Sequence, residues 1–218
     1  MPLALAQEYN GFNDRRVVYA FIRYGKKMID CFADRVKYWL TFNEQNIFHM
    51  PEAFRISGYM KGEQTLRELY ELQHHAMVAH MTLTEYLHQT KPGKLMGGML
   101  AHQLIYPATC KPRDIFCAQQ YDEFLNQNLL RVFAGQGYSP AVMAVVEQEG
   151  FGDIYRADDL ALFARTKNDF MAFSYYASKT LDSDAIPEGT PVNYYLLHGE
   201  KNNPYLKATE WNWQIDPL

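Results

Sequence analysis

The chain has 218 residues and a formal net charge of −4, with 48% hydrophobic and 21% charged residues. This is the composition of an ordinary globular domain, and it lacks the basic surface that nucleic-acid binding requires. No apolar run approaches the ~20 residues that span a bilayer, and the N-terminal segment MPLALAQEYN does not have the pattern of a signal peptide. We therefore predict a single domain over residues 1–218, with neither a nucleic acid nor a membrane as partner.

Cysteine usage favours a reducing compartment. The three cysteines, Cys31, Cys110 and Cys117, are odd in number and match no zinc-ligand spacing. A disulfide framework is therefore not expected, and a cytoplasmic location fits best.

The sequence predicts no metal site and no cofactor. His74, His75 and His80 fall on one predicted helix, at separations of one and five residues. Metal-binding pairs on a helix need separations of three or four, so these residues are interpreted as ordinary helix histidines. The chain also has no phosphate-binding glycine loop, dinucleotide fingerprint or G-x-S-x-G elbow.

Helical and strand patterns alternate along the chain. The first helix shows apolar residues at spacings of three and four, with Asn13 as its predicted N-cap. In the second strand, the pair Gly97-Gly98 predicts a bulge or a close backbone approach. The remainder after residue 180 is predicted to be mostly loop. Helices are predicted at 13–33, 65–89, 114–134, 139–149 and 157–165, and strands at 36–42, 94–102 and 168–180.

Strands separated by helices need crossover connections, which implies a parallel sheet with helices packed outside. Functional groups of such α/β folds gather at the carboxyl ends of the strands. Asn43 and Glu44 follow the strand in VKYWLTFNE, and Tyr176 follows the strand in DFMAFSYY. A carboxylate in that position is either a solvated loop residue or a catalytic group, and the pattern alone leaves both open. The pair Trp211 and Trp213 either packs against the domain or presents a ring at a site.

Several segments together resemble glycoside hydrolase family 1. TFNE at the end of YWLTF resembles the acid/base signature of that family, and MPLALAQEYNGF resembles its segment after the third barrel strand. IYPATCKPRD, DFMAFSYYAS and TEWNWQIDP resemble later landmarks, in the same order. The combination is most similar to the 6-phospho-β-glucosidase branch. The resemblance covers essentially the whole chain and implies an internal fragment of a (β/α)8 barrel, about its fourth to sixth strand units.

The resemblance implies roles for four residues. Glu44 would be the general acid/base, and Asn43 would bind the 2-hydroxyl group of the sugar. Tyr176 would direct its hydroxyl group at the nucleophile, and Trp213 would line the aglycone side. Gln45 departs from the proline or aliphatic residue of many relatives, which would alter the loop rather than the chemistry.

The family nucleophile lies in an E-N-G segment, and this sequence contains neither that segment nor the phosphate-binding loop. A retaining enzyme needs two carboxyl groups, so the expectation is retaining hydrolysis of phosphorylated β-glucosides by the parent enzyme and no activity of these residues alone. Glu210 and Asp216 match no nucleophile position and are expected to be structural or exposed. Two alternatives stay open. One is a non-catalytic remnant or interaction module that self-associates through open sheet edges. The other is a family 1 enzyme of different sugar preference, such as a plain β-glucosidase or a phospho-β-galactosidase.

Overall fold

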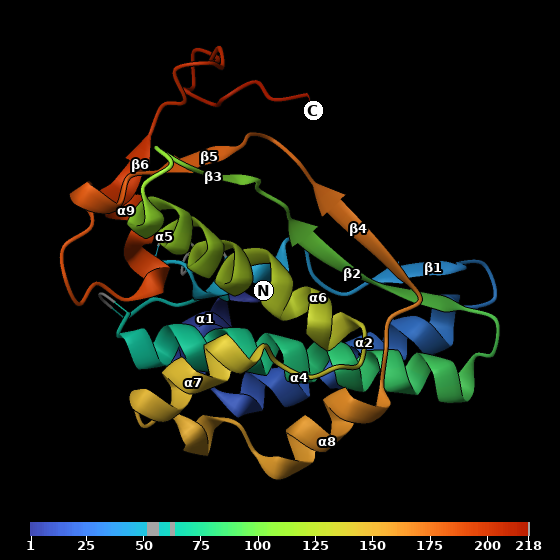
Figure 1. Ribbon diagram of the computed structural model, residues 1–218. Helices are drawn as coiled ribbons and strands as arrows, with labels where there is room; N and C mark the ends of the chain where they lie inside the picture. The colour runs from blue at the N-terminus through green and yellow to red at the C-terminus, as the bar shows by residue number, and fades with distance from the viewer. Residues whose placement is uncertain (52–56, 62–63, 218) are drawn as a thin grey trace.

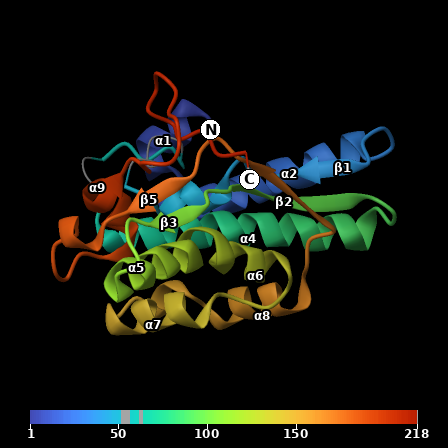
Figure 2. The ribbon, with the colours of Figure 1, turned by 45° about the horizontal axis from the view of Figure 1, so that its top comes forward.

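The computed structural model describes residues 1–51, 57–61 and 64–217. Three strands form the main sheet, and the two longest helices, α2 (Arg15–Phe32) and α4 (Leu66–Thr90), lie side by side beneath it (Figures 1 and 2). None of the helices in the described part of the chain is both long and apolar enough to cross a membrane. The fold is α/β, as the alternation of patterns predicts.

The main sheet is parallel, and its order is β1 (Tyr38–Leu40), β2 (Leu95–Ala101) and β4 (Phe170–Ser174). β1 pairs with the first three residues of β2, whereas β4 pairs with its last five. β2 is therefore the central strand, and it continues past the point where β1 ends. The carboxyl ends of β2 and β4 lie together at one edge.

The N-cap of α2 is Asp14, so the prediction of Asn13 is wrong by one residue. The Asp14 carboxylate accepts a hydrogen bond from the backbone N–H of Arg16 at 2.8 Å. Asn13 belongs to the preceding 3-10 turn η1 (Gly11–Asn13), and its side-chain amide donates to the Glu68 carbonyl at 2.9 Å. A tertiary contact with α4 therefore occupies the side chain that local sequence assigned to the cap, and the carboxylate at the next position caps the helix instead.

Helix α4 begins at a capping box. Thr65 accepts from the Glu68 backbone, and the Glu68 side chain accepts in return from the Thr65 backbone, so two free donors of the first turn are paired. The helix is buried along most of its length and forms the centre of the core. Three of its four histidines, His74, His75 and His80, are also buried rather than exposed to solvent.

The glycine pair in β2 does not form a bulge. The register between β2 and β4 runs without interruption from Gly97 to Ala101, so that part of the prediction is wrong. Instead, aromatic rings occupy the space where glycine side chains would stand. A β-carbon on Gly97 would overlap the ring of Phe170, and one on Gly98 would overlap the ring of Phe133. The pair thus lets rings pack closely against the central strand.

The helix predicted over 114–134 is one continuous helical run with a change of winding. It consists of α5 (Pro112–Asp122), the π-helical turn η3 (Glu123–Gln127) and α6 (Asn128–Phe133). In the π turn, the backbone N–H of Asn128 donates to the carbonyl of Glu123, five residues earlier. Such turns are rare and are found mostly as single insertions in α-helices.

The strand predicted over 168–180 is two strands that belong to different sheets. β5 (Lys179–Leu181) pairs in parallel with β3 (Ile105–Pro107) and antiparallel with β6 (Glu200–Lys201). β3 therefore lies in the landmark IYPATCKPRD, where no strand was predicted, and the tail predicted as mostly loop contains β6. These short strands depend on partners distant in sequence, which local patterns do not reveal.

Short helices complete the fold around the two sheets. They are α1 (Leu3–Tyr9), α7 (Pro140–Gln148), α8 (Ala157–Arg165), α9 (Tyr195–Gly199), η2 (Gln45–His49), η4 (Gly152–Ile154), η5 (Ser183–Ala185) and η6 (Val192–Tyr194).

Among the described residues, the helices cover one face of the main sheet and leave the other face open. Trp39 and Met96 pack against residues of α2 and α4. In β1, Tyr38 and Leu40 stand on either side of Trp39 in sequence, and they are 61% and 48% exposed. Phe173 on the edge strand β4 is 66% exposed. The sheet therefore presents uncovered apolar side chains, which is unusual for a self-contained domain.

The buried histidines are predicted to make the stability of the fold depend on pH. Burial lowers the pKa of His49 to about 3, and burial also lowers the pKa of His75 and of His80 to about 4. In the unfolded chain each titrates near ~6.5. Between about pH 4 and 6.5 the unfolded state therefore binds more protons, and the free energy of unfolding falls with falling pH by about 1.4 kcal/mol per unit for each histidine. Urea unfolding at pH 7.5, 6.5 and 5.5 measures this slope.

The variant His49→Gln removes one of these protonation events and should reduce the slope by about 1.4 kcal/mol per pH unit. His198→Gln, at an exposed position, is the matched control and should leave the slope unchanged. An identical slope in the wild type and in His49→Gln would contradict this account.

We predict that the close packing of the Phe133 ring of α6 against β2 leaves no room for a side chain at Gly98. Gly98→Ala places a methyl group against Phe133 in the core and should lower the free energy of unfolding by about 1–3 kcal/mol. Gly152→Ala is the control, since nothing lies within 4 Å of the added atom there. Denaturant unfolding compares the two variants, and equal stabilities would show that the ring contact is not tight.

Candidate active site

Glu44 lies in the loop that joins β1 to η2, and the residues that precede it in this loop are anchored in the core. Before it, the Thr41 hydroxyl lies 2.6 Å from Nδ1 of buried His80. The Phe42 ring stacks on Phe21 with centroids 4.6 Å apart. Glu44 itself has φ 49° and ψ 53°, the left-handed conformation. This conformation costs a non-glycine residue roughly 1–2 kcal/mol, so the surrounding contacts hold the carboxylate in place.

Tyr176 meets Glu44 across the end of the sheet. It follows β4 by two residues, and its hydroxyl group donates to Oε1 of Glu44 at 2.8 Å. The resemblance implies that this hydroxyl is directed at the nucleophile; here it binds the predicted acid/base. Glu44 is half-buried and Tyr176 is 57% exposed, so the pair faces an open region rather than the core.

Trp213 stands beside Tyr176 and extends the site. The two ring centroids are 5.5 Å apart, at an interplanar angle of 48°. Trp213 is 45% exposed, whereas Trp211 is 76% exposed. Of the two tryptophans whose roles the sequence left open, Trp213 is the one that contacts a predicted site residue.

Gln214, which was not predicted as a site residue, fixes the segment that carries Trp213. Its amide donates to the Ser178 carbonyl at 2.8 Å, and its side-chain oxygen accepts from the backbone N–H of Asn203 at 2.5 Å. Gln214 is 4% exposed. No local pattern marks a glutamine in a polar tail as buried, so the sequence offered no signal for it.

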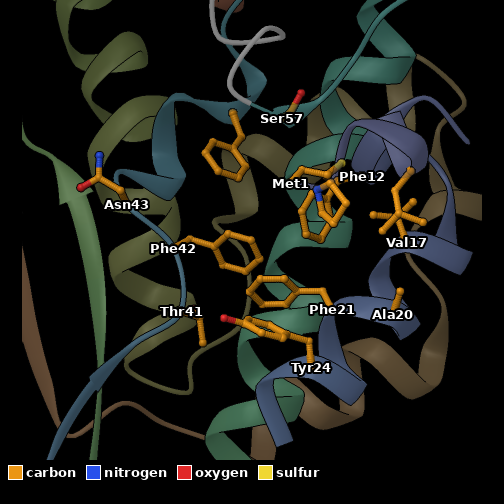
Figure 3. A pocket seen from close by; sticks show the side chains of 13 residues that line it. Met1, Phe12, Val17, Ala20, Phe21, Tyr24, Thr41, Phe42, Asn43 and Ser57 are labelled. Carbon is orange, nitrogen blue, oxygen red and sulfur yellow. The ribbon is translucent and has the colours of Figure 1, made fainter. Parts of the chain in front are cut away.

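Asn43 lies next to Glu44 in sequence, in the same loop between β1 and η2. It is exposed, and it stands at the margin of a cavity of about 630 Å³ between α1, α2 and the β1–η2 loop. Figure 3 shows aromatic rings pointing into this cavity and the Asn43 amide pointing away from them. The labelled rings are those of Phe12, Phe21, Tyr24 and Phe42. Phe48 also lines the cavity. The structure thus brings Glu44, Tyr176 and Trp213 together, with Asn43 on the neighbouring side.

The cavity is apolar and distinct from the Glu44 carboxylate. The described residues that line it include no acidic side chain. Gln45, which the sequence analysis noted as a departure, is 1% exposed and turns its amide towards Met77. It therefore supports the loop from below instead of facing the site.

The other candidate residues of the sequence have structural partners. Nδ1 of His75 donates to the Phe12 carbonyl at 2.7 Å, and His74 lies between Tyr138 and Asp159. Within the described part of the chain no group of three or more histidine, cysteine or acidic side chains could hold a metal ion.

Among the described residues, neither Glu210 nor Asp216 of the tail is a hydrogen-bond partner of Glu44, whose carboxylate accepts from Tyr176. Glu210 is exposed, whereas Asp216 is 5% exposed. The pKa values of Tyr106 and Tyr175 are raised. Burial is the largest cause, and the nearby Asp216 carboxylate is the next. Asp216 therefore belongs to a tyrosine cluster at the end of the chain.

A carboxylate after a strand, with a tyrosine hydroxyl group on it and a tryptophan beside the tyrosine, is an arrangement that fits sugar chemistry. The family model for glycosyl hydrolase family 1 matches residues 1–218. The chain belongs to glycosyl hydrolase family 1. The resemblance of TFNE and the later landmarks implied this family, and the match confirms it.

The similar curated family members act on phosphorylated sugars, by their names. The chain is 34% identical to the aryl-phospho-β-D-glucosidase BglH of Bacillus subtilis and 33% identical to the 6-phospho-β-glucosidase AscB of Escherichia coli. It is also 34% identical to the phospho-cellobiase of Klebsiella oxytoca. Each match covers 100% of this chain and 45–46% of the relative. The chain therefore spans about half the length of the curated relatives it matches.

Solved structures of the family share the fold. A family 1 glycoside hydrolase of Thermotoga maritima superposes with a TM-score of 0.79 at 22% identity, over 100% of this chain and 46% of that one. The AHE enzyme of Alicyclobacillus herbarius gives a TM-score of 0.77 at 24% identity, over 97% of this chain and 46% of that one. At these identities the likeness establishes the fold alone.

Proposed function

We propose that the chain is the middle part of a retaining 6-phospho-β-glucosidase, with Glu44 as the general acid/base. The observation that carries this proposal is the hydrogen bond from Tyr176 to Glu44, which joins two landmarks of the family at the carboxyl ends of the two strands that flank β2. Residues 1–218 would form one unit, in which β1, β2 and β4 are the fourth to sixth strands of the barrel. Their parallel order and the helices on one face support this assignment.

In this mechanism Glu44 has two tasks. As an acid it protonates the oxygen of the leaving group, and as a base it then takes a proton from the water that attacks the glycosyl-enzyme. Asn43 binds the 2-hydroxyl group of the sugar, and the exposed ring of Trp213 lines the aglycone side. Glu44 is half-buried, so it is not sealed inside the core.

Retention also requires a second carboxylate about 5 Å from the first. The described partner of Glu44 is a phenol rather than a carboxylate, and the sequence contains no E-N-G segment. We therefore infer that these 218 residues alone turn over no substrate. The names of the relatives favour a phosphorylated β-glucoside as substrate of the complete enzyme. Free cysteines, two of them exposed, fit a reducing cytoplasm.

The proposal is tested by turnover of an aryl 6-phospho-β-glucoside. The 218-residue chain should show none, whereas a chimera in which it replaces the matching region of AscB should be active. Glu44→Gln in the chimera should lower kcat by about 10²–10⁴-fold, the usual contribution of a general acid/base. Glu210→Gln, at an exposed position, is the control and should have no effect.

Comparing this substrate with the unphosphorylated glucoside and the 6-phospho-β-galactoside separates the proposal from a different sugar preference. Activity of the 218-residue chain that Glu44→Gln abolishes would overturn the claim of inactivity. An active chimera indifferent to Glu44→Gln would overturn the role of Glu44.

A second candidate function is association through the open sheet, and the uncovered side chains favour it. Tyr38 and Leu40 on one edge strand and Met171 and Phe173 on the other are all exposed. Unpaired strand edges bearing apolar residues pair readily with other chains. We expect the 218-residue chain to form a stable oligomer, measured by light scattering after size exclusion. The double variant Leu40→Lys, Phe173→Lys should be monomeric, and a monomeric wild type at all concentrations would contradict this candidate.

A further inference from the structure

The carboxyl end of β2 extends beyond its neighbour on one side. β1 ends at Leu40, opposite Gly97, whereas β2 continues to Ala101. On the β4 side the pairing persists, because the His102 N–H donates to the Ser174 carbonyl at 2.8 Å. In a strand, the peptide groups of successive residues point to opposite sides. The N–H and C=O groups of Ala101 therefore point to the side that β1 has left, at a residue only 4% exposed.

Beside Ala101, the side chain of Asn46 makes the hydrogen bonds that a longer β1 would make. Its Oδ1 accepts from the Ala101 N–H at 2.8 Å, and its Nδ2 donates to the Ala101 carbonyl at 2.8 Å. The side chain is fully buried, at 0% exposure. One amide thus satisfies both backbone groups of a single residue, which would otherwise be buried without partners at a considerable cost.

The same amide also reaches the π turn. Nδ2 of Asn46 donates to the Leu125 carbonyl at 3.1 Å, and Leu125 lies within η3. A π turn displaces backbone carbonyls from their regular α-helical partners. Asn46 therefore joins the loop after β1, the end of β2 and the irregular turn of the helix that packs on the sheet.

These links set the relative position of Glu44 and Tyr176. Glu44 precedes Asn46 by two residues, and Tyr176 follows Ser174, the partner of Ala101 in the register, by two residues. The path from one side chain to the other runs through the pairing of Asn46 with Ala101. Glu44 is also held in a left-handed conformation that its own backbone does not favour.

We propose that Asn46 is a positioning residue for Glu44: it fixes the carboxylate against the Tyr176 hydroxyl group by anchoring the loop to β2 and to η3. The inference rests on the proposed function of Glu44 as acid/base and adds a residue to its machinery. A purely structural role would make Asn46 comparable to Asn128, which is also 0% exposed and whose Oδ1 accepts from the Ser139 backbone at 2.9 Å.

The first test uses the 218-residue chain labelled with 3-fluorotyrosine and read by ¹⁹F NMR, with the Tyr176 signal assigned through Tyr176→Phe. In the wild-type background, Glu44→Gln should shift the Tyr176 signal, because a neutral amide replaces the carboxylate acceptor. In the Asn46→Ala background, Glu44→Gln should cause no shift. In the Asn128→Ala background, the shift should persist even though stability is lost.

The variant Asn46→Asp decides the matter if Asn46→Ala does not fold. It keeps an acceptor for the Ala101 N–H but loses the donor to the carbonyls of Ala101 and Leu125, so the shift on Glu44→Gln should be smaller than in the wild type. An undiminished shift in either Asn46 variant would overturn the proposal. These readouts need no substrate, so they stand apart from any failure of the hydrolytic function.

A second readout applies in the active chimera. A misplacement of about 1 Å in a catalytic group can cost about 10²-fold in rate. Asn46→Ala should therefore lower kcat by about 10²-fold with little change in KM, whereas Asn128→Ala should leave both unchanged at temperatures where it is folded. Equal kinetic effects of the two variants would show that Asn46 acts only on stability.

Discussion

The pairing of β2 with strands on both sides is the constraint on which the rest of the structure depends. β2 is the central strand of the main sheet, and its glycines let rings from α6 and β4 approach closely. Because the strands are parallel, their carboxyl ends meet at one edge. That edge carries the loop with Glu44 and the segment with Tyr176. A carboxylate and a phenol 132 residues apart in sequence therefore become hydrogen-bonded neighbours.

The core and the site make opposite demands on polar groups. His75 and His80 of α4 are buried and neutral, since burial lowers the pKa of each to about 4. Their ring nitrogens find partners within the fold, such as the Phe12 carbonyl and the Thr41 hydroxyl group. Glu44 instead keeps an accessible carboxyl group on a strained backbone. Hydrogen bonds of the neighbouring residues Thr41 and Asn46 with the core allow Glu44 to keep this left-handed conformation.

The uncovered face of the sheet and the single carboxylate at its edge have a common interpretation. Family 1 relatives are about twice as long as this chain, and a sheet with helices on one face has an apolar face that further strands would cover. A retaining glycosidase also needs a second carboxylate opposite the first. Under the proposed function, the exposed side chains of Tyr38 and Leu40 and the phenol partner of Glu44 are both features expected of one part of a larger active site.

The sequence by itself determined the helices, the parallel strands and the family. Capping residues, apolar spacing and the TFNE segment are local signals, and the predictions of α2, α4, β2 and the parallel order are confirmed with shifts of a few residues. Only the tertiary structure decided the cap at Asp14, the absence of a bulge at Gly97, the division between β4 and β5, and the π turn. It also decided that Asn46 and Gln214 are buried amides. Each of these features depends on a partner distant in the chain, and a local pattern carries no information about which distant backbone group a side chain will meet.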